Sequence, residues 1–298
     1  MGTRDMDRVP LVLLSGTLCD ARLWAHQARQ LAGIADPLVG DLTRDDSIGA
    51  MAVGVLAAAA PRFALTGLSM GAIVAFEILR RAPERVLALA LLDTNPAAPD
   101  AGQIAAWRED MRMARAGLFA RFVEERWVPA LLAASGGKGG LLRDAIRGMA
   151  YAVGPRGCAR QLSAQIGRPD SRPSLAAIAC PTLVVGGRQD TLCPPEMHEA
   201  MSAAIPNARL AIVEDCGHLS ALERPEAVTA LLREWLTGVM RIRRDTAPAE
   251  SGGVQPAHER GGDGARARRN VRPRRPGWRR GDTPYALAVP VGMGGRHA

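Results

Sequence analysis

A serine between two glycines has the setting that nucleophilic chemistry requires. The segment Gly67-Leu68-Ser69-Met70-Gly71 follows a mostly apolar run that begins at Phe63, and it precedes apolar residues at helical spacing. A strand, a sharp turn and a helix in this order hold a serine in strained backbone geometry, and the glycines leave room for the crossing elements. The pattern predicts that Ser69 is a nucleophile; a plain glycine–serine turn is the alternative interpretation.

An aspartate and a histidine follow two later apolar runs. Asp190 comes after the run 181–186, and His218 comes after the run 209–213. The carboxyl ends of parallel strands meet at one edge of a sheet, so both side chains are expected to converge on Ser69. In the order Ser, Asp, His, His218 would accept the serine proton and Asp190 would orient the imidazole. A helix N-cap for His218 and a turn for Asp190 are the structural alternatives.

Asp93 is a rival for the role of the acid. It also follows an apolar run, 86–92, and so falls at the same predicted edge of the sheet. Its setting, Asp93-Thr94-Asn95-Pro96, is typical of a turn that leads the chain away from the sheet. Asp190 is therefore the predicted acid.

Acyl transfer also needs hydrogen-bond donors for an oxyanion. In a strand–turn–helix site of this kind, the backbone N–H after the nucleophile is one donor, and it belongs here to Met70. The loop after the first predicted strand supplies the second, for which Thr17 is the candidate because Gly16 permits a close backbone approach.

The elements that must position these residues alternate along the chain. Apolar runs and helical patterns follow one another, and the runs are continuous, as expected for strands buried on both faces. We therefore expect an α/β fold with a doubly wound, mostly parallel sheet and helices on both faces. The predicted strands are 9–14, 38–39, 62–68, 86–92, 181–186 and 209–213.

The segment 99–169 departs from this alternation. It contains four helical patterns and no strand pattern, and a glycine-rich stretch at 135–140 interrupts it. We interpret it as a small helical cap inserted into a core formed by residues 9–98 and 170–240. Ordinary crossover helices are the alternative, but four in succession exceed the length of one βα connection.

The net charge separates the body of the chain from its end. Residues 1–240 contain 25 Lys and Arg and 25 Asp and Glu, whereas residues 241–298 contain 13 and five, so the whole net charge of +8 lies in the tail. The tail is also rich in Gly and Pro and has little apolar periodicity. Such a segment is expected to be disordered. Weak electrostatic contact with nucleic acid is the alternative to no role.

The remaining composition predicts a cytoplasmic protein without a metal or cofactor. Five cysteines without a repeating spacing indicate reduced thiols. No apolar stretch approaches the roughly 20 residues that span a bilayer, so no membrane contact is expected. Cys216 and His218 resemble half of a metal site, but no second close pair follows. Gly186-Gly187 does not complete a phosphate-binding motif.

The chain resembles the α/β-hydrolase superfamily over residues 9–239. The resemblance lies in three segments: the sharp turn at Ser69, which is called the nucleophile elbow, the loop at Asp190 and the segment Asp215-Cys216-Gly217-His218. The elbow is similar to that of small carboxylesterases and enol-lactonases. The resemblance implies a cofactor-independent serine hydrolase that cleaves a small carboxylic ester or lactone through an acyl-serine intermediate. Two departures concern the subfamily: Ser15-Gly16 stands where His-Gly is usual, and Ala72 stands where a glycine is frequent.

Two other functions use the same features. A thioesterase or acyltransferase would employ the same three residues, and a hydrolase fold without activity would serve as a ligand receptor. The intact set of Ser69, Asp190 and His218 favours an enzyme. The cap, which would determine the substrate, contains no recognisable motif, and nothing in the sequence indicates an oligomeric state.

Overall fold

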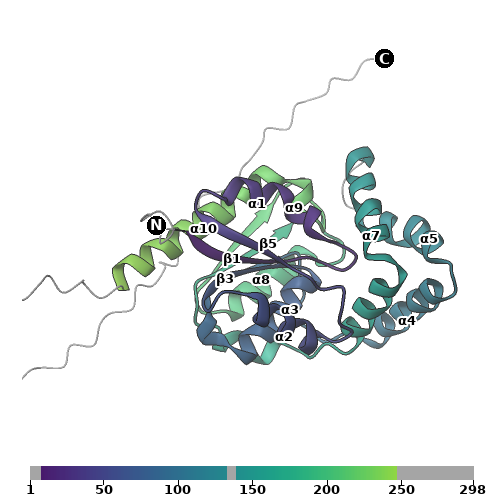
Figure 1. The fold of residues 1–298 in the computed structure, drawn as a ribbon, viewed down its shortest axis with the longest axis horizontal. Helices are drawn as coiled ribbons and strands as arrows, with labels where there is room; N and C mark the ends of the chain where they lie inside the picture. Colours follow the sequence, from purple (N-terminus) through teal and green to yellow (C-terminus); the bar gives the residue numbers. More distant parts are fainter. Residues whose placement is uncertain (1–7, 133–138, 247–298) are drawn as a thin grey trace, which may run out of the picture.

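A single sheet of parallel strands organises the chain. The computed structural model describes residues 8–132 and 139–246, and in this part of the chain six strands pair in the order β2-β1-β3-β4-β5-β6. Every neighbouring pair is parallel, as the continuous apolar runs predicted (Figure 1). The strands are β1 (Val9–Leu14), β2 (Ala35–Gly40), β3 (Phe63–Leu68), β4 (Val86–Leu92), β5 (Thr182–Gly187) and β6 (Ala208–Val213).

Apolar clusters cover both faces of this sheet. Alternate residues of β1 supply them, because Leu11 and Leu13 lie in one cluster and Val12 and Leu14 lie in the other. The first cluster includes residues of α1 (Ala25–Leu31) and α10 (Pro225–Thr246), together with residues of the helices between β4 and β5. The second cluster includes residues of α2 (Ile48–Ala58), α3 (Met70–Arg81) and α8 (Pro195–Ala204). The predicted doubly wound architecture is confirmed.

The edge strand β2 differs from its prediction. Its sequence suggested only residues 38–39, whereas the strand spans Ala35–Gly40 and pairs with β1 along its whole length. Pro37 and the polar residue Asp36 obscured its amino-terminal half. An edge strand tolerates both, since one side of its backbone needs no hydrogen-bonded partner.

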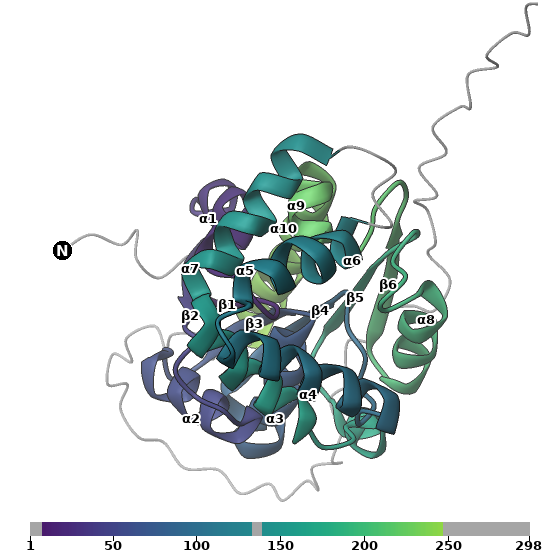
Figure 2. The same ribbon diagram turned by 90° about the vertical axis from the view of Figure 1, so that its right-hand side faces the viewer.

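The described part of the segment between β4 and β5 is mostly helical. Its helices are α4 (Ala101–Arg115), α5 (Phe119–Phe122), a π-helical turn (Val123–Trp127), α6 (Val128–Leu132) and α7 (Gly139–Ile166), and Figure 2 shows them in front of the sheet. Gly154, with a φ of 71°, and Pro155 interrupt α7, which explains why the sequence predicts separate helices over 141–153 and 156–166. The treatment of 99–169 as a distinct cap stays a prediction. Most of the glycine-rich break lies outside the described residues.

Short helical segments complete the described chain. Three 3₁₀ helices span Ala21–Trp24, Pro83–Arg85 and Arg172–Ala177, and α9 spans Ser220–Glu223. The last helix, α10, continues to Thr246, beyond the boundary at 240 that the charge pattern suggested. Residues 247–298, on which the prediction of a disordered tail falls, lie outside the described residues.

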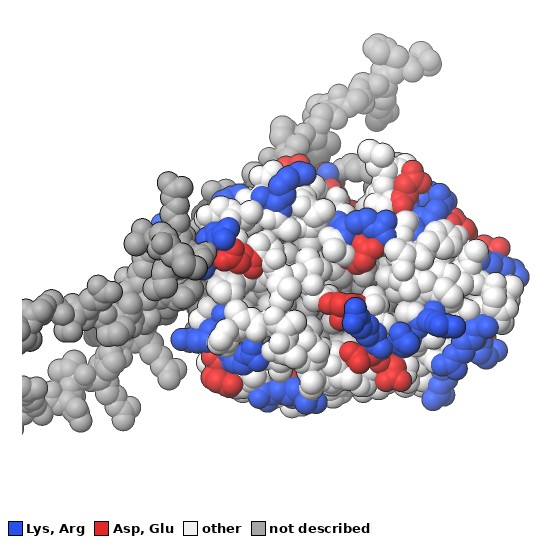
Figure 3. Space-filling model, viewed as in Figure 1, with Lys and Arg blue, Asp and Glu red and all other residues white. Residues whose placement is uncertain are grey.

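The surface of the body matches its balanced charge. Acidic and basic side chains are interspersed over the face in Figure 3. Among the described residues, no helix combines the length and the apolar character needed to cross a bilayer. All five cysteines are free thiols, and Cys180 is the only one of them that is not fully buried.

Candidate active site

The turn between β3 and α3 places Ser69 in a backbone conformation that side chains rarely adopt. Ser69 has a φ of 55° and a ψ of −117°. Its N–H donates to the carbonyl of Leu92 on the adjacent strand, 2.9 Å away, and its carbonyl accepts from the N–H of Ala72, 3.0 Å away. These bonds hold the strained conformation that was predicted for the serine.

The glycines on either side of Ser69 are required by close backbone contacts. A methyl group on Gly67 would lie 2.5 Å from backbone atoms of Gly71 and Ala72. One on Gly71 would lie 2.2 Å from the carbonyl oxygen of Leu14 on β1. Any larger residue at either position would therefore displace the turn, which accounts for the spacing of the motif.

The three residues selected from the sequence form a continuous series of hydrogen bonds. Ser69 Oγ lies 3.0 Å from His218 Nε2, and His218 Nδ1 lies 2.8 Å from Asp190 Oδ2. With the imidazole neutral, Nδ1–H donates to the carboxylate and Nε2 accepts from the serine hydroxyl. The side chain of Asp190 is fully buried and that of His218 is 8% exposed, so water competes little for either bond.

Two opposing effects determine the pKa of His218. Burial acts to lower it, but the hydrogen bond that Nδ1–H donates to Asp190 and the nearby negative charge, chiefly that of Asp190, outweigh burial and raise the pKa above 6.5. The surroundings therefore stabilise the imidazolium that would form when the serine loses its proton.

The loop after β5 positions the carboxylate. Asp190 Oδ1 accepts from the N–H groups of Leu192 and Cys193, at 2.8 and 3.0 Å, which leaves Oδ2 for His218. A methyl group on Gly187 would lie 2.2 Å from the carbonyl oxygen of Gly217, so the absence of a side chain permits the contact between this loop and the loop of His218.

Further hydrogen bonds join the loop after β5 to the loop after β6, which carries His218, and fix the second loop to α9. Gln189 donates its N–H to the carbonyl of Cys216 and accepts the N–H of Cys216 at its side-chain oxygen, at 2.9 and 2.8 Å. Glu223 accepts from the N–H groups of Gly217 and Leu219, on both sides of His218. Sequence reasoning did not find Gln189 or Glu223, since neither lies in a recognisable motif.

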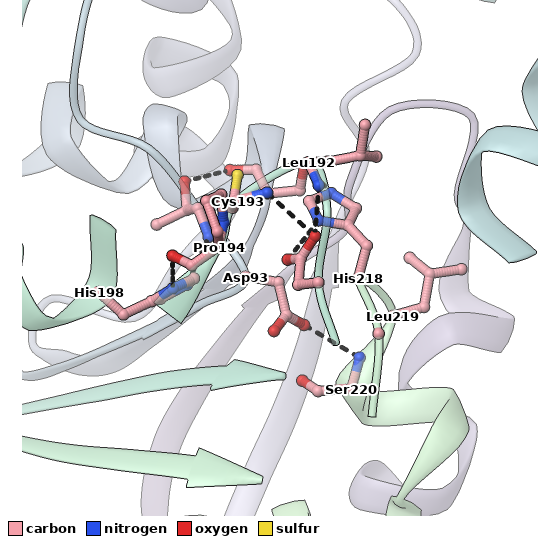
Figure 4. A network of polar contacts seen from close by, with 12 residues as sticks. Asp93, Leu192, Cys193, Pro194, His198, His218, Leu219 and Ser220 are labelled. Atoms are coloured by element: carbon pink, nitrogen blue, oxygen red, sulfur yellow. Dashed lines mark hydrogen bonds and ion pairs between the residues drawn. The ribbon is translucent and has the colours of Figure 1, made fainter. Parts of the chain in front are cut away.

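Asp93, the rival acid, does not pair with the histidine. It is fully buried with a φ of 48°, and its Oδ2 accepts the N–H of Ser220, as Figure 4 shows. Its Oδ1 has no hydrogen-bond partner in the described chain. Burial, together with the negative charge of Asp190, raises the pKa of Asp93 to about 8, so the carboxyl is mostly protonated at neutral pH.

A second histidine, His198 on α8, connects the strand loops beneath the site. Its Nε2 accepts the N–H of Thr94 at 3.1 Å, and its Nδ1 lies 3.3 Å from the carbonyl oxygen of Pro194 (Figure 4). Thr94 in turn donates its hydroxyl to the carbonyl of Ser69 at 3.0 Å. The imidazole is buried, which lowers its pKa and favours the neutral form that this arrangement requires. Its position inside a helix gave no sequence signal.

The loop after β1 runs beside the nucleophile. A methyl group on Gly16 would lie 3.3 Å from Ser69 Cβ, so the next residue, Thr17, is close to the serine. The Thr17 hydroxyl accepts from Gln165 Nε2 at 3.2 Å, and the backbone N–H of Thr17 has no hydrogen-bond partner among the described residues. Met70 is the first residue of α3, where backbone N–H groups point away from the helix without an internal partner.

One group of side chains in the described chain has the composition of a metal site. The ligand atoms of Asp190, Cys193 and His218 lie within 4.8 Å of one another. Metals bind the thiolate, however, and burial raises the pKa of the Cys193 thiol well above 9.0. The carboxylate and the imidazole already bind each other, so these groups fit a proton-transfer site better than a metal site.

The profile of the alpha/beta hydrolase fold matches residues 55–225, which is more than half of the chain. The chain therefore belongs to the alpha/beta hydrolase fold family. The resemblance seen in the sequence is confirmed.

Two esterases are among the most similar proteins. A thermophilic esterase from Thermogutta terrifontis, solved with malate bound, is 31% identical, and the match covers 78% of this chain and 90% of that chain with a TM-score of 0.71. The pimeloyl-[acyl-carrier protein] methyl ester esterase of Neisseria meningitidis is 26% identical over 231 residues, 73% of this chain and 84% of the relative.

An enol-lactonase shares the fold. The structure of this enzyme from Burkholderia xenovorans is 22% identical, and the match covers 78% of this chain and 93% of that chain with a TM-score of 0.69. At this identity the similarity concerns the arrangement of helices and strands only.

Proposed function

We propose that the protein is a serine hydrolase that cleaves a carboxylic ester or lactone through an acyl-serine intermediate. The protein is an α/β-fold hydrolase that acts on ester bonds, as its esterase relatives do. The proposal adds the residues that carry the reaction and the type of intermediate.

The first half of the reaction forms the acyl-enzyme. Ser69 Oγ attacks the carbonyl carbon of the ester while His218 Nε2 accepts the hydroxyl proton, and Asp190 stabilises the resulting imidazolium through Nδ1–H. His218 then donates the proton to the departing alcohol oxygen. In a lactone, that oxygen stays attached to the acyl group.

The second half releases the acid. A water molecule gives a proton to His218 and attacks the acyl carbon, and the proton then returns to Ser69 Oγ as the ester bond to the serine breaks. In both halves the backbone N–H groups of Thr17 and Met70 are the proposed donors to the oxyanion. Neither half requires a metal or a cofactor.

One observation carries the proposal. Hydrogen bonds of 2.8 and 3.0 Å connect Asp190, His218 and Ser69 in that order. A fold that served only to bind a ligand would not need this series, in which each atom has the partner that acyl transfer requires.

Covalent labelling tests the nucleophile directly. A fluorophosphonate probe is expected to modify the wild-type protein at Ser69 and to leave Ser69→Ala unmodified. The same variant, with an unchanged circular-dichroism spectrum, is expected to lose at least ~10³-fold in kcat on 4-nitrophenyl esters. Unchanged turnover by Ser69→Ala would refute the mechanism, and a folded wild-type protein that resists the probe would favour a ligand receptor.

A substrate panel tests the class of bond. Rates on 4-nitrophenyl esters of increasing chain length, on enol- and γ-lactones and on acyl thioesters are compared at equal enzyme concentration. The proposal expects kcat/KM for an ester or lactone to exceed that for the thioester with the same acyl group. The reverse order would assign the site to a thioesterase.

A further inference from the structure

Arg168 is a buried cation to which the proposed reaction gives no role. It follows the carboxyl end of α7 and exposes 7% of its surface. Its contacts are neutral: Nε donates to the carbonyl of Ala97, Nη1 donates to Gln165 Oε1, both at 3.0 Å, and the guanidinium lies 5.4 Å from the ring centre of Trp107. The ion pairs of the described residues do not include Arg168.

A buried charge without a contacting counter-ion is costly to the fold. Burial lowers the pKa of Arg168, because water solvates the cation poorly at this position. The ionised forms of Cys193 and Asp100 would oppose this shift from a distance. The Cys193 thiol is neutral at pH 7, and Asp100 caps α4 by accepting from Gln103. The guanidinium keeps its proton at any ordinary pH, so the positive charge persists.

The place of this charge is close to the proposed catalytic residues. The side chain of Gln165 accepts from Arg168 at one end and donates to the hydroxyl of Thr17 at the other, at 3.0 and 3.2 Å. Arg168 also acts electrostatically on Cys193, whose N–H binds Asp190. Its Nη2 has no hydrogen-bond partner among the described residues. This nitrogen is not fully buried, so a ligand atom can reach it.

We propose that Arg168 binds a carboxylate of the substrate, so that the preferred ester or lactone carries a free carboxylate group. This inference rests on the proposed function. A carboxylate is planar and singly charged, and it matches the donor fork of a guanidinium. Binding would neutralise the buried charge, whereas a phosphate dianion would leave one negative charge uncompensated.

A pair of substrates that differ only in charge tests the proposal. In 4-nitrophenyl hydrogen succinate a carboxylate replaces the terminal methyl group of 4-nitrophenyl butyrate. Arg168→Gln is expected to lower kcat/KM for the succinate ester by ~10- to 100-fold, chiefly through KM, and that for the butyrate ester by less than about threefold. Arg168→Lys keeps the charge without the fork and is expected to lie between Arg168→Gln and wild type on the succinate ester.

A matched control separates this effect from a general loss of positive charge. Arg172 pairs with Asp170 at the surface, and its side chain is 65% exposed. Arg172→Gln is expected to leave both esters unaffected. If Arg168→Gln and Arg168→Lys instead slow both esters by the same factor, Arg168 only supports the structure and the proposal is overturned.

A binding measurement keeps the test independent of catalysis. At constant ionic strength, succinate is expected to raise the melting temperature of wild type and of Ser69→Ala. The shift is expected to be smaller for Arg168→Gln and for Arg168→Lys. This result would support the anion site even if the fluorophosphonate test failed, and a shift that is equal in all four proteins would overturn it. An equal or larger effect of phosphate would overturn the choice of a carboxylate.

Discussion

At the scale of single residues, the bond between His218 and Asp190 sets the protonation state from which the proposed reaction would start. The nearby negative charges raise the pKa of His218 above 6.5 even though burial opposes them. His218 accepts a proton only when it is neutral, so kcat/KM is expected to rise with pH through a pKa above that of free histidine. The pH dependence of initial rates on a 4-nitrophenyl ester measures this value.

Asp190→Asn tests the cause of that shift. The amide removes the negative charge and favours the other imidazole tautomer, so kcat is expected to fall by up to ~10⁴-fold. The residual activity is expected to titrate at a lower pH than that of wild type, because burial then acts on His218 with less opposition. If the pH profile of the variant had its inflection at the same pH as that of wild type, Asp190 would not set the pKa of His218.

Asp93 is expected to affect stability rather than turnover. Its folded-state pKa of about 8 exceeds the ordinary value of 3.8, so the stability gained from its protonation is fully present below pH 3.8 and is lost as the pH rises through 8. Asp93→Asn cannot ionise and can still accept from Ser220. The free energy of unfolding of the variant minus that of wild type should therefore grow between pH 4 and pH 8, by at most about 1.4 kcal/mol per pH unit. The difference between the two melting temperatures, measured over the same pH range, is expected to grow with it.

The same pair of variants decides which aspartate is the acid. Asp93→Asn is expected to keep kcat within about tenfold of wild type, whereas Asp190→Asn is not. A larger loss for Asp93→Asn, with both variants folded, would move the role to Asp93. The sequence placed both carboxylates at the same edge of the sheet and favoured Asp190 because the setting of Asp93 is typical of a turn, and the side-chain hydrogen bonds pair Asp190 and not Asp93 with His218.

At the scale of elements, close approach of the loops after β5 and β6 brings Asp190 to His218. Gly187→Ala would place a methyl group 2.2 Å from the carbonyl oxygen of Gly217, and the loops would have to separate. We expect a loss of at least ~10-fold in kcat, because small displacements of catalytic groups are costly to the rate. Steady-state rates and the melting temperature of the purified variant measure the two effects.

Gly33→Ala is the control for this prediction. Gly33 has nothing within 4 Å of the added methyl group, so activity and melting temperature are expected to stay unchanged. If Gly187→Ala retained full kcat, the contact between the two loops would not be needed to align the acid with the histidine.

The elements that the sequence predicted well are those with a continuous apolar pattern. The ranges expected for β1 and β4 match the observed strands residue for residue, because both lie inside the sheet and are buried on both faces. The edge strand β2 was predicted only in part because few of its residues are buried, and α9 was missed because four residues are too few to show a helical period.

The residues that support the site were predicted less well than those at its centre. Ser69, Asp190 and His218 follow strands, where chain position alone indicates a shared edge. Gln165, on α7, and Gln189, beside Asp190 in the loop after β5, make their contacts through side-chain amides, and these contacts span 148 and 27 residues of sequence. Contacts between residues so far apart in the sequence depend on how the elements pack, and a local sequence pattern does not predict them.

At the scale of the whole molecule, the body and the tail are expected to behave independently. Residues 247–298 hold most of the excess positive charge and have little apolar periodicity, so they offer no face that the core needs. A chain that ends at Thr246, the last residue of α10, is therefore expected to keep the melting temperature and kcat of the full-length protein. Differential scanning calorimetry and ester hydrolysis compare the two proteins.

Ending the chain at Arg241 instead would remove the last residues of α10. If only this shorter chain had a lower melting temperature, the boundary of the folded body would lie at the end of the helix.

Polyanion binding provides the second comparison. The full-length protein is expected to bind single-stranded DNA weakly, with an affinity that falls steeply as salt rises, and the chain that ends at Thr246 is expected not to bind. A loss of several degrees on removal of 247–298, or DNA binding that resists salt, would show that the tail belongs to the functional protein.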